Sequence, residues 1–299
     1  MGKYQGINKH VRFEEIFTSH SKTTCNWSPG PGFYTWAWFN LLFFRSLCCP
    51  FRSIQPFGGP VSNFTDLVDS EIDGKVSKIM KEGIQPEKIE INDWSFRIQQ
   101  PSQPNEKNKL LLLLHGHLGN ENVMWTLTNP IPGTYYILAP RAPIQLGVDQ
   151  YSWHEIQPQW PKIKLYEEIT DQLIRSIEVW LEEQELNCAQ LDVMGFSQGA
   201  VLACAFALHH LEKVRKIAAL SGFIPQSWQQ ELSNRDLKGK QIFIAHGKQD
   251  EIVPIFKARQ AATWLTEHDA QVTLCETGTG HKIGVNCLKS FGAFFRSPN

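Results

Sequence analysis

Three side chains in the C-terminal half of the chain have the types that nucleophilic catalysis needs. Ser197 stands between two glycines in the stretch VMGFSQGA, directly after an apolar run. Asp250 and His281 each follow a later apolar run, Asp250 in HGKQDEIVP and His281 in GTGHKIG. A serine becomes a nucleophile when a histidine takes its proton and an acid orients that histidine. These three residues could therefore form a catalytic triad.

The glycines around Ser197 have a mechanical role in such a site. In the pattern Gly-x-Ser-x-Gly the serine occupies a sharp, strained turn between a strand and a helix, where side chains at the flanking positions would clash. The N-terminus of the following helix also offers N–H groups to an oxyanion. A serine that only caps a helix after a glycine turn is the competing interpretation. The chain order Ser, Asp, His, with each residue after an apolar run, favours the nucleophile.

Other acidic residues and histidines fit the triad less well. Glu251 is next to Asp250 but would point elsewhere on the turn, and Glu276 ends its strand before the loop. The remaining histidines of this region lie along helices or in an HG turn: His209, His210, His246 and His268. We therefore expect Asp250 to orient His281, and His281 to act as the base.

An oxyanion hole needs two N–H donors, one from the residue after the nucleophile and one from the loop after an early strand. Gln198 supplies the first. The stretch LLLLHGHLGNE supplies the second, and we expect its donor to be the backbone N–H of His117, which Leu118 follows. His115 and His117 do not indicate a metal site, because no carboxylate or cysteine has a suitable spacing. We expect neither a metal nor another cofactor.

Short apolar segments alternate with helical patterns over most of the chain. We expect strands at 110–114, 135–139, 191–196, 216–222, 241–247 and 271–276. We expect helices at 164–184, directly after Ser197, at 255–268 and near 283–296. Strands that are apolar throughout are typical of parallel strands with helices on both faces. The sequence therefore predicts an α/β protein, a three-layer sandwich with a mostly parallel sheet, whose ligand site lies at the carboxyl ends of the strands.

The first 60 residues differ in pattern from the rest. We predict a poorly patterned N-terminal extension over residues 1–60 and a single catalytic domain over residues 61–299. At the start of that domain, residues 63–83 have the apolar spacing of an amphipathic helix, and Lys88–Gln99 alternates like an edge strand.

An aromatic run, FYTWAWFNLLFF, lies inside the extension. It has about 12 residues, and a membrane-spanning helix needs about 20, so it is too short to cross a bilayer. Residues 33–49 are a candidate for peripheral membrane contact, with Cys48 and Cys49 as palmitoylation candidates. The alternatives are a loosely ordered extension, or translated sequence upstream of the true start.

Composition and cysteine usage are those of an ordinary soluble protein. The chain is 42% hydrophobic and 20% charged with a formal net charge of −1, which does not favour a nucleic-acid partner. The seven cysteines are odd in number and have no metal-ligand spacing, so we expect neither a disulfide framework nor a zinc site. The first twenty residues contain charges and no continuous apolar core, so we expect no cleavable signal peptide and a cytoplasmic location.

Taken in order, several stretches resemble the carboxylesterase, phospholipase and acyl-protein thioesterase branch of the α/β-hydrolases. They are LLLHGHLGNENVMW, APRAPIQLGVDQYSWHEI, GFSQGAVLA, HGKQDEIVP and GTGHKI, and together they span roughly residues 108–290. The resemblance implies serine-dependent hydrolysis of carboxylic esters or thioesters without a cofactor. Two features depart from it: His117 stands where the thioesterases commonly have leucine, and about 80 N-terminal residues match nothing in the family.

The substrate pocket is predicted from loop lengths and aromatic residues. Only 18 residues separate Gly222 from Gln241. We therefore expect no lid domain after the strand at 216–222, the first strand after the helix that follows Ser197. We expect Leu118, Trp125 and Trp153 to line the acyl pocket, Trp153 because it matches the serine-tryptophan pair of the family. The competing interpretation is that these aromatic residues cover an edge between helix and sheet.

Two other classes of function compete with an esterase on this fold. A peptidase would usually carry a propeller or cap to select peptides, and the sequence shows neither. A non-catalytic hydrolase-fold binding module would usually lack a triad residue, and none is missing here. We therefore expect an enzyme that cleaves a small ester or acyl thioester; the length of the acyl chain, the leaving group and the oligomeric state stay open.

Overall fold

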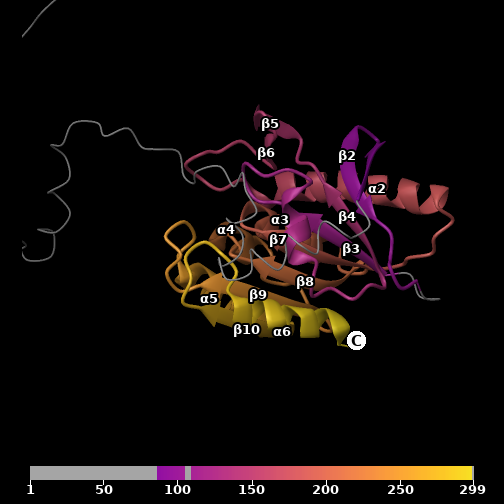
Figure 1. Ribbon diagram of the computed structural model, residues 1–299. Helices are drawn as coiled ribbons and strands as arrows, with labels where there is room; N and C mark the ends of the chain where they lie inside the picture. Colours follow the sequence, from indigo (N-terminus) through magenta and orange to yellow (C-terminus); the bar gives the residue numbers. More distant parts are fainter. Residues whose placement is uncertain (1–85, 105–108, 298–299) are drawn as a thin grey trace, which may run out of the picture. The chain divides into compact units, whose positions relative to one another are not determined.

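A mixed eight-stranded sheet lies between helices in the computed structural model, which describes residues 86–104 and 109–297 (Figure 1). Its strands are β1 (Glu87–Ile91), β2 (Trp94–Gln99), β3 (Lys109–Leu114), β4 (Tyr135–Pro140), β7 (Leu191–Phe196), β8 (Val214–Leu220), β9 (Gln241–Gly247) and β10 (Gln271–Thr277). The spatial order is β1-β2-β4-β3-β7-β8-β9-β10, and only β2 runs antiparallel to its neighbours. A separate two-stranded sheet pairs β5 (Ile144–Gly147) with β6 (Gln150–Ser152).

Helices cover both faces of the large sheet, which makes the fold a three-layer α/β sandwich. They are η3 (Val123–Leu127), α2 (Ile163–Glu183), α3 (Gln198–His209), α4 (Gln226–Glu231), α5 (Ile255–Glu267) and α6 (Val285–Arg296). One apolar core lies between the sheet and α2, α3 and α5, and the other lies between the sheet and η3 and α6. Figure 1 shows α6 on one face and α2 and α3 on the other.

The continuous apolar strands supply both cores because successive side chains of a strand point to opposite faces. In β3, Leu110, Leu112 and Leu114 belong to the core beneath α2 and α3. Leu111 and Leu113 belong to the core beneath α6. The predicted fold class is therefore confirmed. The central strands, and the predicted helices that fall on described residues, are in place to within a few residues at their ends.

The N-terminal edge of the sheet differs from the prediction. Lys88–Gln99 was expected to be a single edge strand, but it forms the β1–β2 hairpin. Asn92 and Asp93 form the two-residue turn with φ of 47° and 67°. Such turns need two residues with positive φ, and asparagine and aspartate adopt that conformation more readily than other residues with side chains. The polar pair is therefore a turn signal, which the alternation of the flanking residues concealed.

No lid domain follows β8, as predicted, because the described chain between β8 and β9 contains only the short helix α4. The predictions for the extension 1–60, for membrane contact through 33–49 and for a helix at 63–83 lie outside the described residues. Among the helices that are described, none has the length and hydrophobicity required to span a membrane.

Candidate active site

Ser197 occupies the turn between β7 and α3 in a backbone conformation that is rare for a residue with a side chain. Its φ is 54° and its ψ is −115°. Its N–H donates to the carbonyl of Leu220 in β8 at 2.8 Å, which fixes the turn against the neighbouring strand. Conformations of this kind persist only where the surrounding structure imposes them, and they are concentrated at functional sites.

The two glycines beside Ser197 are required by close approaches of the backbone. A Cβ atom on Gly195 would lie 2.0 Å from the carbonyl oxygen of Gly199. A Cβ atom on Gly199 would lie 2.1 Å from the carbonyl oxygen of Leu114 in β3. Both distances are far inside van der Waals contact, and both neighbours are backbone atoms that cannot rotate away. The strand-to-helix turn predicted from Gly-x-Ser-x-Gly is therefore present, and any larger residue would disrupt it.

The structure brings the three predicted triad residues together in one hydrogen-bonded chain. His281 Nδ1–H donates to Asp250 Oδ2 at 2.7 Å. With Nδ1 protonated, the neutral imidazole presents Nε2 as an acceptor, and Ser197 Oγ–H donates to it at 2.9 Å. The residues come from the ends of three strands, β7 for Ser197, β9 for Asp250 and β10 for His281. A hydroxyl held in this way is arranged for transfer of its proton to the imidazole.

Asp250 is held as a carboxylate by donors on both of its oxygens. Its side chain is fully buried, and Oδ1 accepts from the N–H groups of Ile252 and Val253 at 2.9 and 2.8 Å. Burial acts to raise the pKa of this carboxyl, but the hydrogen bond and charge of His281 and the Val253 N–H outweigh it and leave the pKa below its usual value. The acid is therefore ionised at neutral pH and orients His281.

His246 contacts Asp250, although the sequence analysis placed it in an HG turn and predicted no role for it. This buried imidazole donates from Nε2 to the carbonyl of Val253 at 2.7 Å, and the same nitrogen lies 3.3 Å from Asp250 Oδ2. It thus braces the segment that presents the aspartate. Its position at the end of β9, four residues before the acid, was the available signal.

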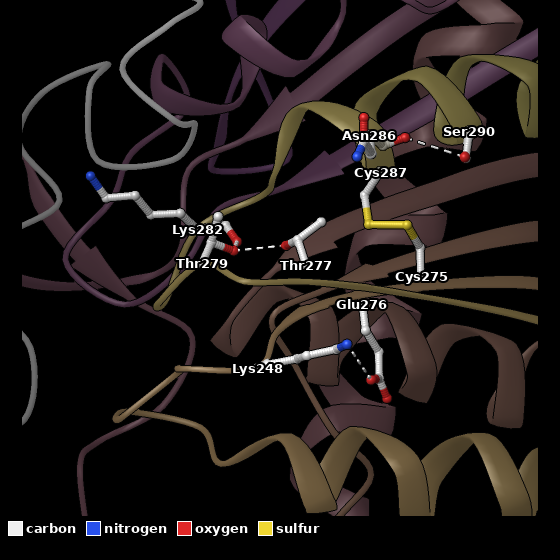
Figure 2. Close-up of a disulfide and its surroundings, with 9 residues drawn as sticks. All are labelled: Lys248, Cys275, Glu276, Thr277, Thr279, Lys282, Asn286, Cys287 and Ser290. Atoms are coloured by element: carbon white, nitrogen blue, oxygen red, sulfur yellow. Dashed lines mark hydrogen bonds and ion pairs between the residues drawn. A yellow bond between two sulfur atoms is a disulfide. The ribbon is translucent and has the colours of Figure 1, made fainter.

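A disulfide closes the segment that carries His281. Cys275 of β10 is bonded to Cys287 in the first turn of α6, with the two Cα atoms 5.7 Å apart (Figure 2). The expectation of no disulfide is therefore wrong for this pair, while Cys188 and Cys204 are free thiols. The pairing follows from the packing of α6 against β10, and no spacing rule in the sequence could show it.

The loop after β3 carries the second expected oxyanion donor, the backbone N–H of His117, at a point where its neighbours are hydrogen-bonded. The N–H of Leu118 donates to Tyr151 O at 2.9 Å, and that of Gly119 donates to Gly116 O at 3.1 Å. No described carbonyl accepts from the N–H of His117. Gln198 is the first residue of α3, where N–H groups have no partner inside the helix. This arrangement agrees with the choice of His117 over Leu118 as an oxyanion donor.

The side chain of Gln198 ties the two halves of the candidate oxyanion hole together. Its Oε1 accepts from the Trp153 N–H at 3.0 Å, and its Nε2 donates to Ser152 Oγ at 3.0 Å. Ser152 Oγ donates to His154 O at 2.6 Å and accepts from His117 Nδ1–H at 3.2 Å. Sequence reasoning assigned Gln198 only a backbone role. The serine-tryptophan pair at 152–153 was the available signal for this network.

His115 is a structural residue of the same loop. It is completely buried, Nδ1–H donates to Gly116 O at 2.7 Å, and Nε2 accepts from the Ala142 N–H at 3.0 Å. Burial lowers its pKa to about 4, so the ring is neutral at physiological pH. Both ring nitrogens are occupied by backbone groups, which leaves no nitrogen for a metal shared with His117.

Two of the three predicted pocket residues are in the core instead. Trp153 is 1% exposed, and its Nε1–H donates to His115 O at 2.7 Å. Trp125 is 5% exposed and donates to Glu121 O at 2.8 Å. Each indole fills a core site that also satisfies its N–H, so neither lines an open acyl pocket. Leu118 is partly exposed beside His117, with a φ of 63°.

The competing acids lie away from the triad, as predicted. Glu276 forms a paired hydrogen bond with Arg259, with 2.6 Å from Arg259 Nε to Oε1 and 2.8 Å from Nη2 to Oε2. Glu251 is exposed on the turn after Asp250. Among the described residues, the His281 ring bonds to Asp250 and Ser197 and to neither of these carboxylates.

Solved structures of several esterases share this fold. A carboxylesterase from Bacillus cereus superposes with a TM-score of 0.60 at 18% identity, over 74% of this chain and 98% of that protein. A carboxylesterase from Mesorhizobium loti gives a TM-score of 0.59 at 24% identity, over 71% and 99% of the two chains. A phospholipase/carboxylesterase from Dyadobacter fermentans gives 0.54 at 20% identity, over 72% and 99%. At these identities the likeness shows the fold.

Sequence comparison supplies the family. No curated protein sequence matches the chain. A family model described as phospholipase/carboxylesterase matches residues 94–297, which include every residue of the candidate site. The match extends over more than half of the 299 residues. The chain therefore belongs to the phospholipase/carboxylesterase family of α/β-hydrolases.

Proposed function

We propose that this protein is a serine hydrolase that cleaves carboxylic esters or thioesters through an acyl-enzyme on Ser197. The observation that carries the proposal is the chain of hydrogen bonds from Ser197 Oγ through His281 to Asp250. Family membership supports ester hydrolysis, and this geometry supports the serine mechanism. The site needs no cofactor, because the three side chains and two backbone N–H groups suffice for acyl transfer.

The reaction proceeds in two halves. His281 takes the proton of Ser197 as Oγ attacks the carbonyl carbon, and the N–H groups of His117 and Gln198 stabilise the oxyanion. The protonated His281 gives its proton to the departing alcohol or thiol, which leaves an ester on Ser197. A water molecule then gives a proton to His281 and attacks this ester. His281 returns that proton to Ser197 Oγ as the bond to the acyl group breaks, which releases the acid and restores the free enzyme. Asp250 keeps the imidazole in the required tautomer throughout.

The acyl group is expected to meet Leu118 rather than the two tryptophans. Leu118 follows the proposed oxyanion donor and is partly exposed, whereas Trp125 and Trp153 are buried. We therefore expect Leu118→Ala to change the preference for acyl chain length more than it changes the turnover of acetyl esters. A panel of p-nitrophenyl esters of increasing length, with one acyl thioester alongside, measures both this preference and the choice between ester and thioester.

Covalent labelling separates this proposal from a binding module without activity. A fluorophosphonate probe should label wild-type protein at Ser197 and should not label Ser197→Ala. The same variant should lose about 10⁵- to 10⁶-fold in kcat. Retention of ester turnover in Ser197→Ala, or absence of the adduct in wild-type protein, would overturn the assignment. Cleavage of peptides but not of esters would point to the peptidase alternative.

A further inference from the structure

Two consecutive histidines at the C-terminal end of α3 converge on an aspartate of α2. His209 Nε2 lies 3.0 Å and His210 Nε2 lies 3.2 Å from Asp171 Oδ1. The three ligand atoms that these residues offer all lie within 4.8 Å of one another. Among the described residues, no other three histidine, cysteine, aspartate or glutamate side chains bring their ligand atoms this close together.

The end of α3 allows two neighbouring side chains to face the same point. Within an α-helix, successive side chains point about 100° apart around the axis, so consecutive residues diverge. α3 ends at His209, and His210 leaves the helical conformation with φ of −110° and ψ of 57°. The two imidazole centroids are consequently only 4.5 Å apart.

One nitrogen of this cluster is buried without a hydrogen bond. His210 Nε2 is inaccessible to solvent and has no hydrogen-bond partner among the described residues, although Asp171 Oδ1 is 3.2 Å away. Buried polar atoms are nearly always satisfied, by protein, water or an ion. A cation between His210, His209 and the carboxylate would give this nitrogen a partner.

A second carboxylate lies behind one of the histidines. His209 Nδ1 is 3.5 Å from Glu167 Oε1, and Glu167 precedes Asp171 by one turn of α2. Histidines that bind metals usually face a carboxylate or carbonyl with their other ring nitrogen, which fixes the ring and increases its basicity. The cluster thus has an outer as well as an inner set of groups.

We propose that Asp171, His209 and His210 bind one divalent transition-metal ion of the zinc type. Zinc takes imidazole nitrogen and carboxylate oxygen at about 2.0 to 2.2 Å in a tetrahedron, so neighbouring ligand atoms lie about 3.3 Å apart. The distances of 3.0 and 3.2 Å from Asp171 Oδ1 to the two nitrogens agree with this spacing. Two imidazoles exclude magnesium and calcium, which prefer oxygen ligands. Water completes the coordination.

The ion joins α2 to the far end of the helix that begins at Ser197. α3 has 12 residues, so the cluster lies about 18 Å along its axis from the nucleophile. The bound ion therefore acts as a clamp between two helices and takes no part in ester hydrolysis. This proposal is independent of the proposed function, because it is tested by metal binding rather than by turnover.

The test is a calorimetric titration of the full-length protein with Zn²⁺ after removal of metal by a chelator. Wild-type protein should bind one ion at this site, and Asp171→Asn and His210→Gln should each weaken that binding by at least about 100-fold. Glu167→Gln should weaken it by about 10-fold, because it alters only the outer group. His268→Gln is the matched control, since His268 also ends a helix but bonds to the carbonyls of Trp264 and Ser233.

Two further measurements keep the result unambiguous. Zn²⁺ should raise the Tm of wild-type protein and leave that of His210→Gln unchanged, because only a ligand that binds the folded state stabilises it. Co²⁺ in place of Zn²⁺ should give an absorption spectrum without thiolate charge transfer.

An affinity for Zn²⁺ that is the same in wild-type, Asp171→Asn and Glu167→Gln proteins would overturn the proposal, as would no binding by wild-type protein. If Asp171→Asn does not fold, Glu167→Gln decides.

Discussion

Two histidine–aspartate pairs lie at opposite ends of α3, and their surroundings give them different chemistry. His281 and Asp250 lie at the N-terminal end, where the second imidazole nitrogen accepts from the hydroxyl of Ser197. His209 and Asp171 lie at the C-terminal end, where the second nitrogen faces the carboxylate of Glu167. One pair can move a proton to and from a nucleophile. The other concentrates ligand atoms for a cation.

The two histidine–aspartate pairs also differ in how deeply their aspartates are buried. The Asp250 side chain is fully buried and has two backbone N–H donors, whereas the Asp171 side chain is 39% exposed. A carboxylate held by fixed donors in a protein interior keeps its geometry through a reaction without reorganisation. A half-exposed carboxylate on a helix surface gains little from an ion pair alone. The residue types are the same, and the environment decides what they can do.

The largest expected effect is the loss of the base. His281→Gln should lower kcat by about 10⁶-fold, because His281 is the described side chain that hydrogen-bonds to Ser197 Oγ and can take its proton. The corresponding change at the other pair, His209→Gln, should appear as weaker Zn²⁺ binding. Steady-state hydrolysis of a p-nitrophenyl ester measures the first effect, with His268→Gln as the control for removal of an imidazole. Turnover by His281→Gln close to the wild-type rate would refute the role of this histidine.

The next effect is the loss of the orienting acid. Asp250→Asn should lower kcat by about 10⁴-fold, because an amide no longer stabilises the required tautomer and the charged imidazole. Asp269→Asn, an exposed aspartate after α5, is the matched control and should keep full activity. Equal kcat values for the two variants, measured with the same ester, would show that His281 works without Asp250.

The disulfide closes the loop that carries His281 of the catalytic pair. The described residues around His209 and Asp171 contain no such bond. Cys275 and Cys287 are 12 residues apart, and closing a loop of that length stabilises the folded state by about 3 kcal/mol. Cys275→Ser with Cys287→Ser should lower the free energy of unfolding by this amount in urea titrations. A reductant should lower the wild-type value similarly and leave that of the double variant unchanged.

Cys188→Ser is the control for the disulfide, because Cys188 is a half-buried free thiol. It should respond to the reductant as wild-type protein does. If the double variant and wild-type protein are equally stable under oxidising conditions, the disulfide does not contribute to stability.

The smallest expected effect concerns pH and the buried histidine at the catalytic end. The pKa of His115 is about 4 in the folded state and 6.5 in its ordinary state, because burial disfavours the charged ring. Between these values the unfolded chain binds the proton and the folded chain does not, so stability falls as pH decreases from 6.5 towards 4. This contribution is fully present well above pH 6.5, and its loss between pH 6.5 and 4 is about 2 to 3 kcal/mol.

Urea unfolding of wild-type protein and His115→Gln across this range tests the contribution of His115. The stability of the variant should depend less steeply on pH between 6.5 and 4, whatever its absolute value. His268→Gln is again the control, and it should retain the wild-type slope. Identical slopes for His115→Gln and wild-type protein would mean that the buried ring is protonated in both states or in neither.

Much of the fold and the triad could be predicted because both depend on local patterns. Apolar runs such as Leu191–Phe196 show a strand covered on both faces, and the glycines around Ser197 show a turn without room for side chains. Asp250 and His281 could be chosen because the carboxyl ends of parallel strands meet at one edge of the sheet. Each of these inferences needs only the residues of one segment and the rule that the carboxyl ends of parallel strands meet at one edge of the sheet.

The failures concern contacts between segments. Trp153 reads as a pocket residue from its motif, but its indole lies under the β3 loop and bonds to His115 O. Asp171 and His209 are 38 residues apart on different helices, so no spacing pattern shows that they meet. The turn at Asn92 and Asp93 was not predicted, because apolar and polar residues alternate on both sides of it as they would in one long strand.

An α/β sandwich with a serine, an acid and a histidine at three strand ends follows from the amino-acid sequence alone. These features follow from hydrophobic periodicity and from the sterics of glycine, which act within a few residues of each position. Three contacts depend on how distant segments pack: the bond from Cys275 to Cys287, the hydrogen bonds of the Gln198 side chain to Ser152 and Trp153, and the approach of two histidines to Asp171. Those contacts arise from the packing of helices and loops on the sheet, where side-chain partners are set by distance in space.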